Sequence, residues 1–381
     1  MEIKRERNYS IELLRVIAMI GIVLLHTQMK TGWLQQRSVG HVGWLGSWGI
    51  HACCMVSVNL YVLITGYFMP GSTRSTGKVF SLWKSAVVWG VLILGLALFL
   101  DAGAISPKDL IRAFLPISTR QYWFLTVYVA LYLLSPYLDQ LLGGLTKKQY
   151  QGLLSILICL FSLFPSLVPW GGEDGVYGIN GLGGTNIAWF CVLYAVAGYL
   201  RRFAQIEKLR RYRIWSLAIY VVSILGMLAF QFCMELVQNR IGSGGSYGTW
   251  FLNYSSILNL TATLGLFVFF LTMELRLTDK TKKTLMFFSQ GAFGVYLIHE
   301  NPKMRPILWG FVQKIDEQYL AGVNYTCKIL LVAVGIFVVF CFLENCRKKI
   351  SGHFLHSRVV ALAKKTDSFL YPGESMKNEG V

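Results

Sequence analysis

Long apolar segments are the sequence feature that most constrains the fold of this chain. A helix that crosses a bilayer needs about 20 mostly apolar residues, and such stretches recur along almost all of the 381 residues. Because backbone polar groups within lipid must be bonded internally, stretches of this length fold as helices. We therefore predict an all-α, polytopic membrane protein with about ten transmembrane helices, over residues 10–30, 50–70, 79–100, 122–143, 150–170, 186–203, 212–234, 250–273, 285–301 and 325–346.

The charge distribution predicts the orientation of these helices and excludes one class of partner. Only 14% of the residues are charged, against about a quarter in a soluble domain. About two thirds of the Lys and Arg residues fall in alternate connecting segments, beginning with the amino-terminal one, as the positive-inside rule requires of cytoplasmic loops. We therefore place both termini in the cytoplasm. The net charge is +17, and we expect the basic residues to contact anionic lipids of the bilayer. We expect no nucleic acid as a partner.

The first apolar segment carries ionisable residues at positions that share one helix face. Arg15 and His26 are eleven residues apart, so on a helix they point within about 20° of each other and lie about 16 Å apart along the axis. Glu12, one turn before Arg15, is placed to pair with it. Ionisable side chains within a membrane are costly and indicate function. The alternative is that Arg15 reaches the headgroups and His26 is a satisfied polar residue at the opposite interface.

Two cations and one amide mark the next candidate stretch. Asn59 lies in the second apolar segment, and Arg74 and Lys78 follow in the first cytoplasmic loop. A cationic pair at this position can hold the phosphates of a cytoplasmic donor. The positive-inside rule alone also explains the two cations.

Aromatic residues mark the expected outer face. Tyr122 and Trp123 open the fourth apolar segment, and three Trp residues lie in the connecting segment 31–49. Such residues either stack on a sugar ring or anchor the protein at the membrane interface.

A second histidine lies near the outer end of the ninth segment. His299, Glu300 and Asn301 are consecutive there, and Arg305 follows. An imidazole beside a carboxylate, at the depth expected for His26, can form a general-base site. The alternative is an interfacial polar cluster. No metal is expected, because the six His residues are scattered and no metal-ligand motif is present.

Of the two histidines, His26 is the stronger candidate for the base. A neutral imidazole can take the proton of an alcohol as its oxygen attacks a thioester carbonyl. Nearby cations can hold the donor's phosphates or stabilise the developing oxyanion.

The ordered motifs resemble the acyltransferase-3 family of membrane O-acyltransferases. NYSIELLR, followed ten residues later by His26, is similar to the first helix of that family. Similar motifs then follow in the family's order over about residues 8–346, namely Gly66-Tyr67-Phe68, the basic loop with Arg74, Tyr122-Trp123-Phe124-Leu125, and the segment from Gly291 to His299. Thr65 stands where the family commonly has Ser, and the basic loop has fewer Arg residues.

The resemblance implies a ten-helix enzyme that moves an acyl group from cytoplasmic acetyl-CoA, or a related acyl-CoA, to a hydroxyl of a surface glycan. It implies that Arg15 and His26 are the core catalytic pair and that Arg74, with Lys78, contacts the CoA phosphates. We add His299 and Glu300 as catalytic candidates. As substrate-binding candidates we add Glu12, Asn59, Tyr122, Trp123, Asn301 and Arg305.

These observations predict an O-acetyltransferase of the bacterial cytoplasmic membrane that acts on a glycan or lipid-linked sugar. Residues 1–346 form its membrane domain and residues 347–381 a basic, polar cytoplasmic tail. Because no esterase-like domain follows the last segment, transfer is either direct or completed by a separate extracytoplasmic protein. The alternative is a transporter or flippase of an anionic or glycan cargo, which predicts paired halves and discontinuous helices.

Overall fold

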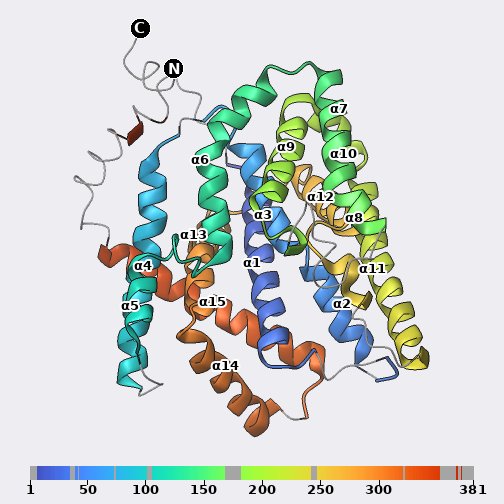
Figure 1. Cartoon of the computed structure of the whole chain (residues 1–381). Coiled ribbons are helices and arrows are strands. Elements are labelled where there is room, and N and C mark those ends of the chain that lie inside the picture. The colour runs from blue at the N-terminus through green and yellow to red at the C-terminus, as the bar shows by residue number, and fades with distance from the viewer. Residues whose placement is uncertain are drawn as a thin grey trace.

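The computed structural model describes residues 7–34, 39–41, 43–72, 74–100, 105–167, 182–241, 247–320, 322–351, 366–367 and 370. Within these residues the chain forms helices and connecting turns, and no strand. The all-α prediction is therefore confirmed (Figure 1). Most of the predicted tail over 347–381 lies outside the described residues.

The helices follow one another with short connections. The α-helices are α1 (Tyr9–Lys30), α2 (Trp44–Cys54), α3 (Ser57–Phe68), α4 (Thr76–Phe99), α5 (Pro107–Phe114), α6 (Trp123–Gly143), α7 (Lys147–Ile158), α8 (Phe164–Leu167), α9 (Ile187–Phe203), α10 (Ile206–Arg211), α11 (Arg213–Ile241), α12 (Ile257–Leu271), α13 (Asp279–His299), α14 (Met304–Ile315) and α15 (Tyr325–Ser351). Four short helical turns complete the set, namely η1 (Cys159–Leu163), η2 (Leu182–Gly184), η3 (Tyr247–Leu252) and η4 (Asp316–Leu320).

Each of the ten predicted spans coincides with one helix or with two or three consecutive helical elements, although residues 168–170 of the fifth span lie outside the described residues. Eight spans in the described residues are long and apolar enough to cross a bilayer. The other two are α9, which has only 17 residues, and α13, whose first turns carry Asp279, Lys280, Lys282 and Lys283. Both pack against other helices of the bundle, α9 on α3 and α6 and α13 on α1 and α15. Their neighbours therefore supply part of the apolar contact that lipid gives to the longer helices.

Helix α1 lies in the middle of the bundle (Figure 1) and contacts α2, α3, α12, α13 and α15. The Asn8 side chain caps its start by accepting a hydrogen bond from the Ile11 amide, which satisfies one of the free donors of a helix amino terminus. Gly21 allows close packing of α3, because a β-carbon there would collide with the Ser57 hydroxyl. Because α1 is central, its polar side chains contact neighbouring helices.

Helix α13 is held against α15 by two glycines. A β-carbon on Gly291 would lie 2.9 Å from the Cys341 sulfur, and one on Gly294 would overlap the Glu344 side chain. Glu344 is buried and accepts a hydrogen bond from Trp89 of α4. This close packing sets the position of the carboxyl-terminal end of α13, where His299 lies beside α1.

Candidate active site

A cavity of about 830 Å³ follows α1 through the interior of the protein. Arg15 and His26 both line it, as do Met19 and Ile22 between them, so the prediction that Arg15 and His26 share one face of this helix is confirmed. At 1.5 Å of rise per residue, the cavity covers roughly 16 Å between the levels of Arg15 and His26. We call these two regions the Arg15 end and the His26 end of the cavity. Its middle is lined mainly by apolar side chains of α1, α3, α6 and α13.

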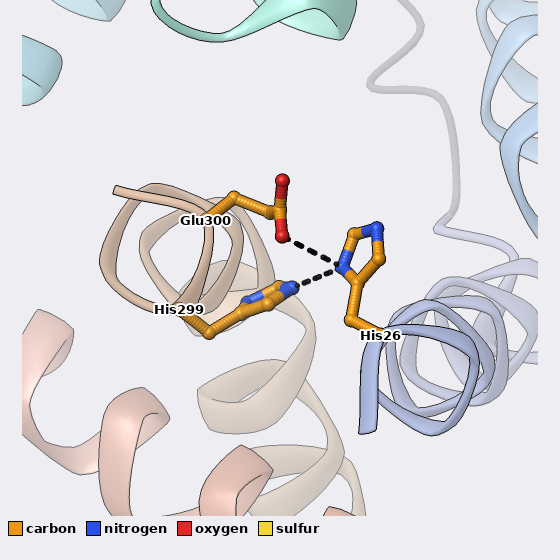
Figure 2. Close-up of side chains that lie close together, drawn as sticks. All are labelled: His26, His299 and Glu300. Carbon is orange, nitrogen blue, oxygen red and sulfur yellow. Dashed lines mark hydrogen bonds and ion pairs between the residues drawn. The ribbon is translucent and has the colours of Figure 1, made fainter. Parts of the chain in front are cut away.

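At the His26 end, two histidines and a carboxylate meet from α1 and α13 (Figure 2). Nδ1 of His26 lies 2.8 Å from Nε2 of His299 and 3.4 Å from a carboxylate oxygen of Glu300. His299 is fully buried and Glu300 is 5% exposed. Of the three, His26 alone lines the cavity, so His299 and Glu300 stand behind it.

The hydrogen bonds of His299 determine which ring nitrogens carry protons. Nδ1 of His299 lies 2.6 Å from the Val295 carbonyl oxygen, which only accepts, so this nitrogen must be the donor. In the neutral ring Nε2 of His299 is then an acceptor, and His26 donates to it from Nδ1. The proton on Nδ1 leaves Nε2 of His26 with a lone pair. This nitrogen has no hydrogen-bond partner within the described part of the chain.

Glu300 places a negative charge beside the His26 ring. Its carboxylate is ion-paired with Arg305, while its other oxygen, the one nearest His26, has no hydrogen-bond partner in the described residues. An ionised carboxylate at this distance stabilises an imidazolium through Coulomb attraction, which is strong where water is excluded. Glu300 is therefore placed to stabilise a positive charge that forms on the His26 ring during a reaction.

The same three side chains are of types that act as metal ligands. Their ligand atoms lie within 4.8 Å of one another. Two nitrogens on one tetrahedral zinc ion would be about 3.3 Å apart, given Zn–N bonds of roughly 2.0–2.1 Å. The observed 2.8 Å between the two ring nitrogens fits a hydrogen bond better. The absence of a metal therefore remains our expectation.

At the Arg15 end, the guanidinium lies partly exposed to the cavity. Arg15 pairs with Glu12 at 2.9 Å, and Glu12 accepts a hydrogen bond from Ser289 of α13. The Tyr61 hydroxyl donates to the Arg15 carbonyl oxygen at 2.8 Å.

Lys78 of α4 also lines the cavity, and its ammonium lies 5.0 Å from the centre of the Tyr132 ring. Helix α3 runs towards the Arg15 end, with Ser57 beside Gly21 and Tyr61 beside Arg15. Because α4 begins shortly after α3 ends, Lys78 in its first turn lies at the same end of the cavity as Arg15.

A family model described as an acyltransferase domain matches residues 8–345. The chain belongs to the acyltransferase-3 family. The match covers nearly all the helices described above, so this protein is a multi-pass membrane acyltransferase. No curated protein and no solved structure matches the chain.

Arg74 of this acyltransferase is buried away from the cavity. Its guanidinium pairs with Asp139 of α6 at 2.5 Å and donates to Ser135 at 3.0 Å and to the Met69 carbonyl oxygen at 2.6 Å. Arg74 is 5% exposed and is absent from the cavity lining. These contacts fasten the loop before α4 to α6. A contact with CoA phosphates stays a prediction for this residue.

The other predicted substrate-binding residues divide into one that lines the cavity and several that support it. Trp123 lines the cavity. The Tyr122 hydroxyl donates to the Leu297 carbonyl oxygen and accepts from Asn301, which fixes the end of α13 that carries His299. Asn59 donates to the Tyr254 carbonyl oxygen at 2.7 Å and is fully buried.

Sequence reasoning missed His51, which lines the same cavity from α2. It lies within an apolar stretch, GIHACC, with no charged residue near it. The available signal was its spacing of three residues from Trp48, which puts both rings on one side of a helix. Tyr61 and Ser289 were also missed, because nothing in the sequence links them to Arg15 and Glu12.

Proposed function

We propose that this acyltransferase moves an acetyl or other short acyl group from acyl-CoA to a hydroxyl of a cell-surface or exported glycan. The observation that carries the proposal is one cavity with Arg15 and Lys78 at one end and His26 at the other. Cations bind phosphates, and a histidine with a free ring nitrogen can act as a general base. Both functions are needed for acyl transfer from CoA to an alcohol.

The donor is proposed to enter from the cytoplasmic side at the Arg15 end. The positive-inside distribution of Lys and Arg supports a cytoplasmic position for that end of α1. Arg15 and Lys78 would hold the phosphates, and the pantetheine arm would extend through the apolar middle of the cavity. This places the thioester carbonyl near His26, about 16 Å further along α1.

The acceptor hydroxyl is proposed to bind at the His26 end. As its oxygen attacks the thioester carbonyl, Nε2 of His26 takes the hydroxyl proton, and a tetrahedral intermediate forms. The carbon–sulfur bond then breaks, the ester is released, and the CoA thiolate leaves with the proton returned by His26. His299 keeps the ring in the required tautomer, and Glu300 stabilises the imidazolium between the two proton transfers.

We assign the enzyme to the bacterial cytoplasmic membrane, with the glycan reached from the outer face. Direct transfer needs only the cavity described above. Where the acceptor lies beyond the reach of His26, a separate extracytoplasmic protein would carry the acyl group further.

The test is the O-acetyl content of the host's surface glycans, measured by mass spectrometry in four strains: wild type, deletion, His26→Ala and His41→Ala. His41 is an exposed histidine outside the cavity lining and serves as the control, with membrane abundance measured for each variant. We expect one ester to be lost in the deletion and His26→Ala strains and kept in the His41→Ala strain. An unchanged glycan in the deletion strain would overturn the glycan acceptor, and cargo uptake without acyl-CoA consumption would favour a transporter.

A further inference from the structure

A second buried histidine lines the cavity at the depth of His26. Helices α1 and α2–α3 run antiparallel, with Gly21 against Ser57 and Gln28 bonded to the Ser47 carbonyl oxygen at 2.8 Å. Interpolating between these two contacts puts His51 of α2 about level with residues 25–26 of α1. His51 lines the cavity and is 7% exposed.

The neighbours of Gln28 determine the tautomer of His51. Nε2 of Gln28 donates to the Ser47 carbonyl oxygen and to the Tyr325 hydroxyl, each at 2.8 Å. Because a carbonyl only accepts, the amide cannot be turned round. Its oxygen therefore faces Nδ1 of His51, 3.2 Å away, and Nδ1 must be the donor. The neutral ring then has its lone pair on Nε2.

This lone pair is directed at the cavity and has no partner. Gln28 is absent from the cavity lining, so the Nδ1 edge of His51 is turned away from the cavity and the Nε2 edge towards it. No hydrogen bond to Nε2 of His51 exists within the described residues. His51 is 7% exposed, so a hydrogen-bond donor can reach Nε2 only from the cavity. A hydroxyl group of a ligand in the cavity would supply that donor.

The surrounding lining suits a hydroxylated ring. Trp48 lies beside His51, with ring centres 5.6 Å apart at an interplanar angle of 73°, and it also lines the cavity. Small-molecule sites usually combine aromatic surface with a few polar groups that fix the orientation of the ligand. Trp48 and His51 supply one of each. Sugars offer an apolar face and several hydroxyl donors.

We propose that Trp48 and His51 form an acceptor subsite that binds the carbohydrate ring of the acceptor beside His26. This inference rests on the proposed function and goes beyond it by naming the residues that select the acceptor. Nε2 of His51 accepts a hydrogen bond from a second hydroxyl of the sugar, which orients the reacting hydroxyl towards His26. His51 is a specificity-determining residue and takes no part in proton transfer.

The experiment measures acetyl transfer from radiolabelled acetyl-CoA to glycan extracted from the deletion strain, using full-length protein in detergent. The variants are His51→Phe, which keeps the ring and removes the acceptor nitrogen, and His51→Gln, whose amide oxygen can accept in its place. We expect His51→Phe to raise the KM for glycan about tenfold, as the loss of one buried hydrogen bond predicts. The KM for acetyl-CoA should stay within about twofold, and His51→Gln should recover part of the glycan affinity.

The outcomes separate the subsite from the proposed function. If the wild-type protein acetylates the glycan while both His51 variants keep the wild-type KM for it, the subsite is overturned alone. A parallel rise in the KM for acetyl-CoA would show a structural role and would also overturn it. No transfer by the wild-type protein would overturn the proposed function, and the subsite with it. If His51→Phe does not accumulate, the test rests on His51→Gln. An unchanged KM for glycan in that variant would overturn the proposal.

Discussion

Nδ1 of His26 and Nε2 of His299 lie 2.8 Å apart, although the two residues are 273 positions apart in the chain. The contact joins α1 to the end of α13, and the Val295 carbonyl oxygen behind His299 sets the direction of both hydrogen bonds. In the proposed mechanism His299 is a positioning residue, whose effect reaches the reactants through His26. Its role resembles that of the group that orients the histidine in a catalytic triad.

His299→Phe should lower the turnover number for acyl transfer by about 100-fold or more, because His26 would no longer be held in the tautomer with a free Nε2. His299→Gln should retain more activity, since its amide oxygen can accept from Nδ1 of His26. The measurement is kcat for acyl transfer, with KM for acyl-CoA as a second readout. Equal loss in the two variants would contradict a role in setting the tautomer.

Glu300→Gln should lower kcat by about 10–100-fold, because the variant keeps the shape of the side chain and loses the charge that stabilises the His26 imidazolium. The matched control is Glu317→Gln, which changes an exposed carboxylate of η4. Transfer rates for both variants should be compared at equal membrane abundance. A Glu300→Gln enzyme as fast as the control would show that this charge does not act on His26.

Arg15→Ala and Lys78→Ala should each raise the KM for acyl-CoA by about tenfold, the loss expected for one charge-assisted contact. Lys280→Ala, which changes an exposed cation outside the cavity lining, is the control and should leave that KM unchanged. Steady-state kinetics with varied acyl-CoA give the comparison. An unchanged KM for acyl-CoA in both cavity variants would show that the donor phosphates bind elsewhere.

Arg74→Ala and Asp139→Ala distinguish a structural ion pair from a phosphate contact. Removing one member of a buried pair destabilises a protein by about 3–5 kcal/mol; a smaller effect is expected here, since the Asp139 side chain is 24% exposed. Both variants should therefore lower the thermal stability of the purified protein. If Arg74 binds CoA phosphates, only Arg74→Ala should also raise the KM for acyl-CoA.

Removal of divalent metals should leave acyl transfer unchanged, because the distance between His26 and His299 fits a hydrogen bond. Activity should be measured after treatment with a strong chelator and again after adding zinc. If acyl transfer is lost on chelation and recovered with zinc, His26, His299 and Glu300 form a metal site. That result would overturn the general-base mechanism.

The sequence alone determined the helical architecture and one face of the site. A bilayer allows few folds, because unpaired backbone groups are too costly within it, so long apolar segments predicted the helices. The spacing of Arg15 and His26 placed both on one face of α1, since helix geometry is local and independent of the neighbours. The family resemblance rests on the same local motifs and their order.

Tertiary structure decided how distant segments meet. It joined His26 to His299, buried Arg74 against Asp139, and brought His51 to the depth of His26 through the register of α1 with α2. These contacts depend on how side chains from several helices fill a common volume, and periodicity within one segment carries no information about that. Local helix geometry was therefore predictable from the sequence, while the partners of each polar side chain were decided by packing.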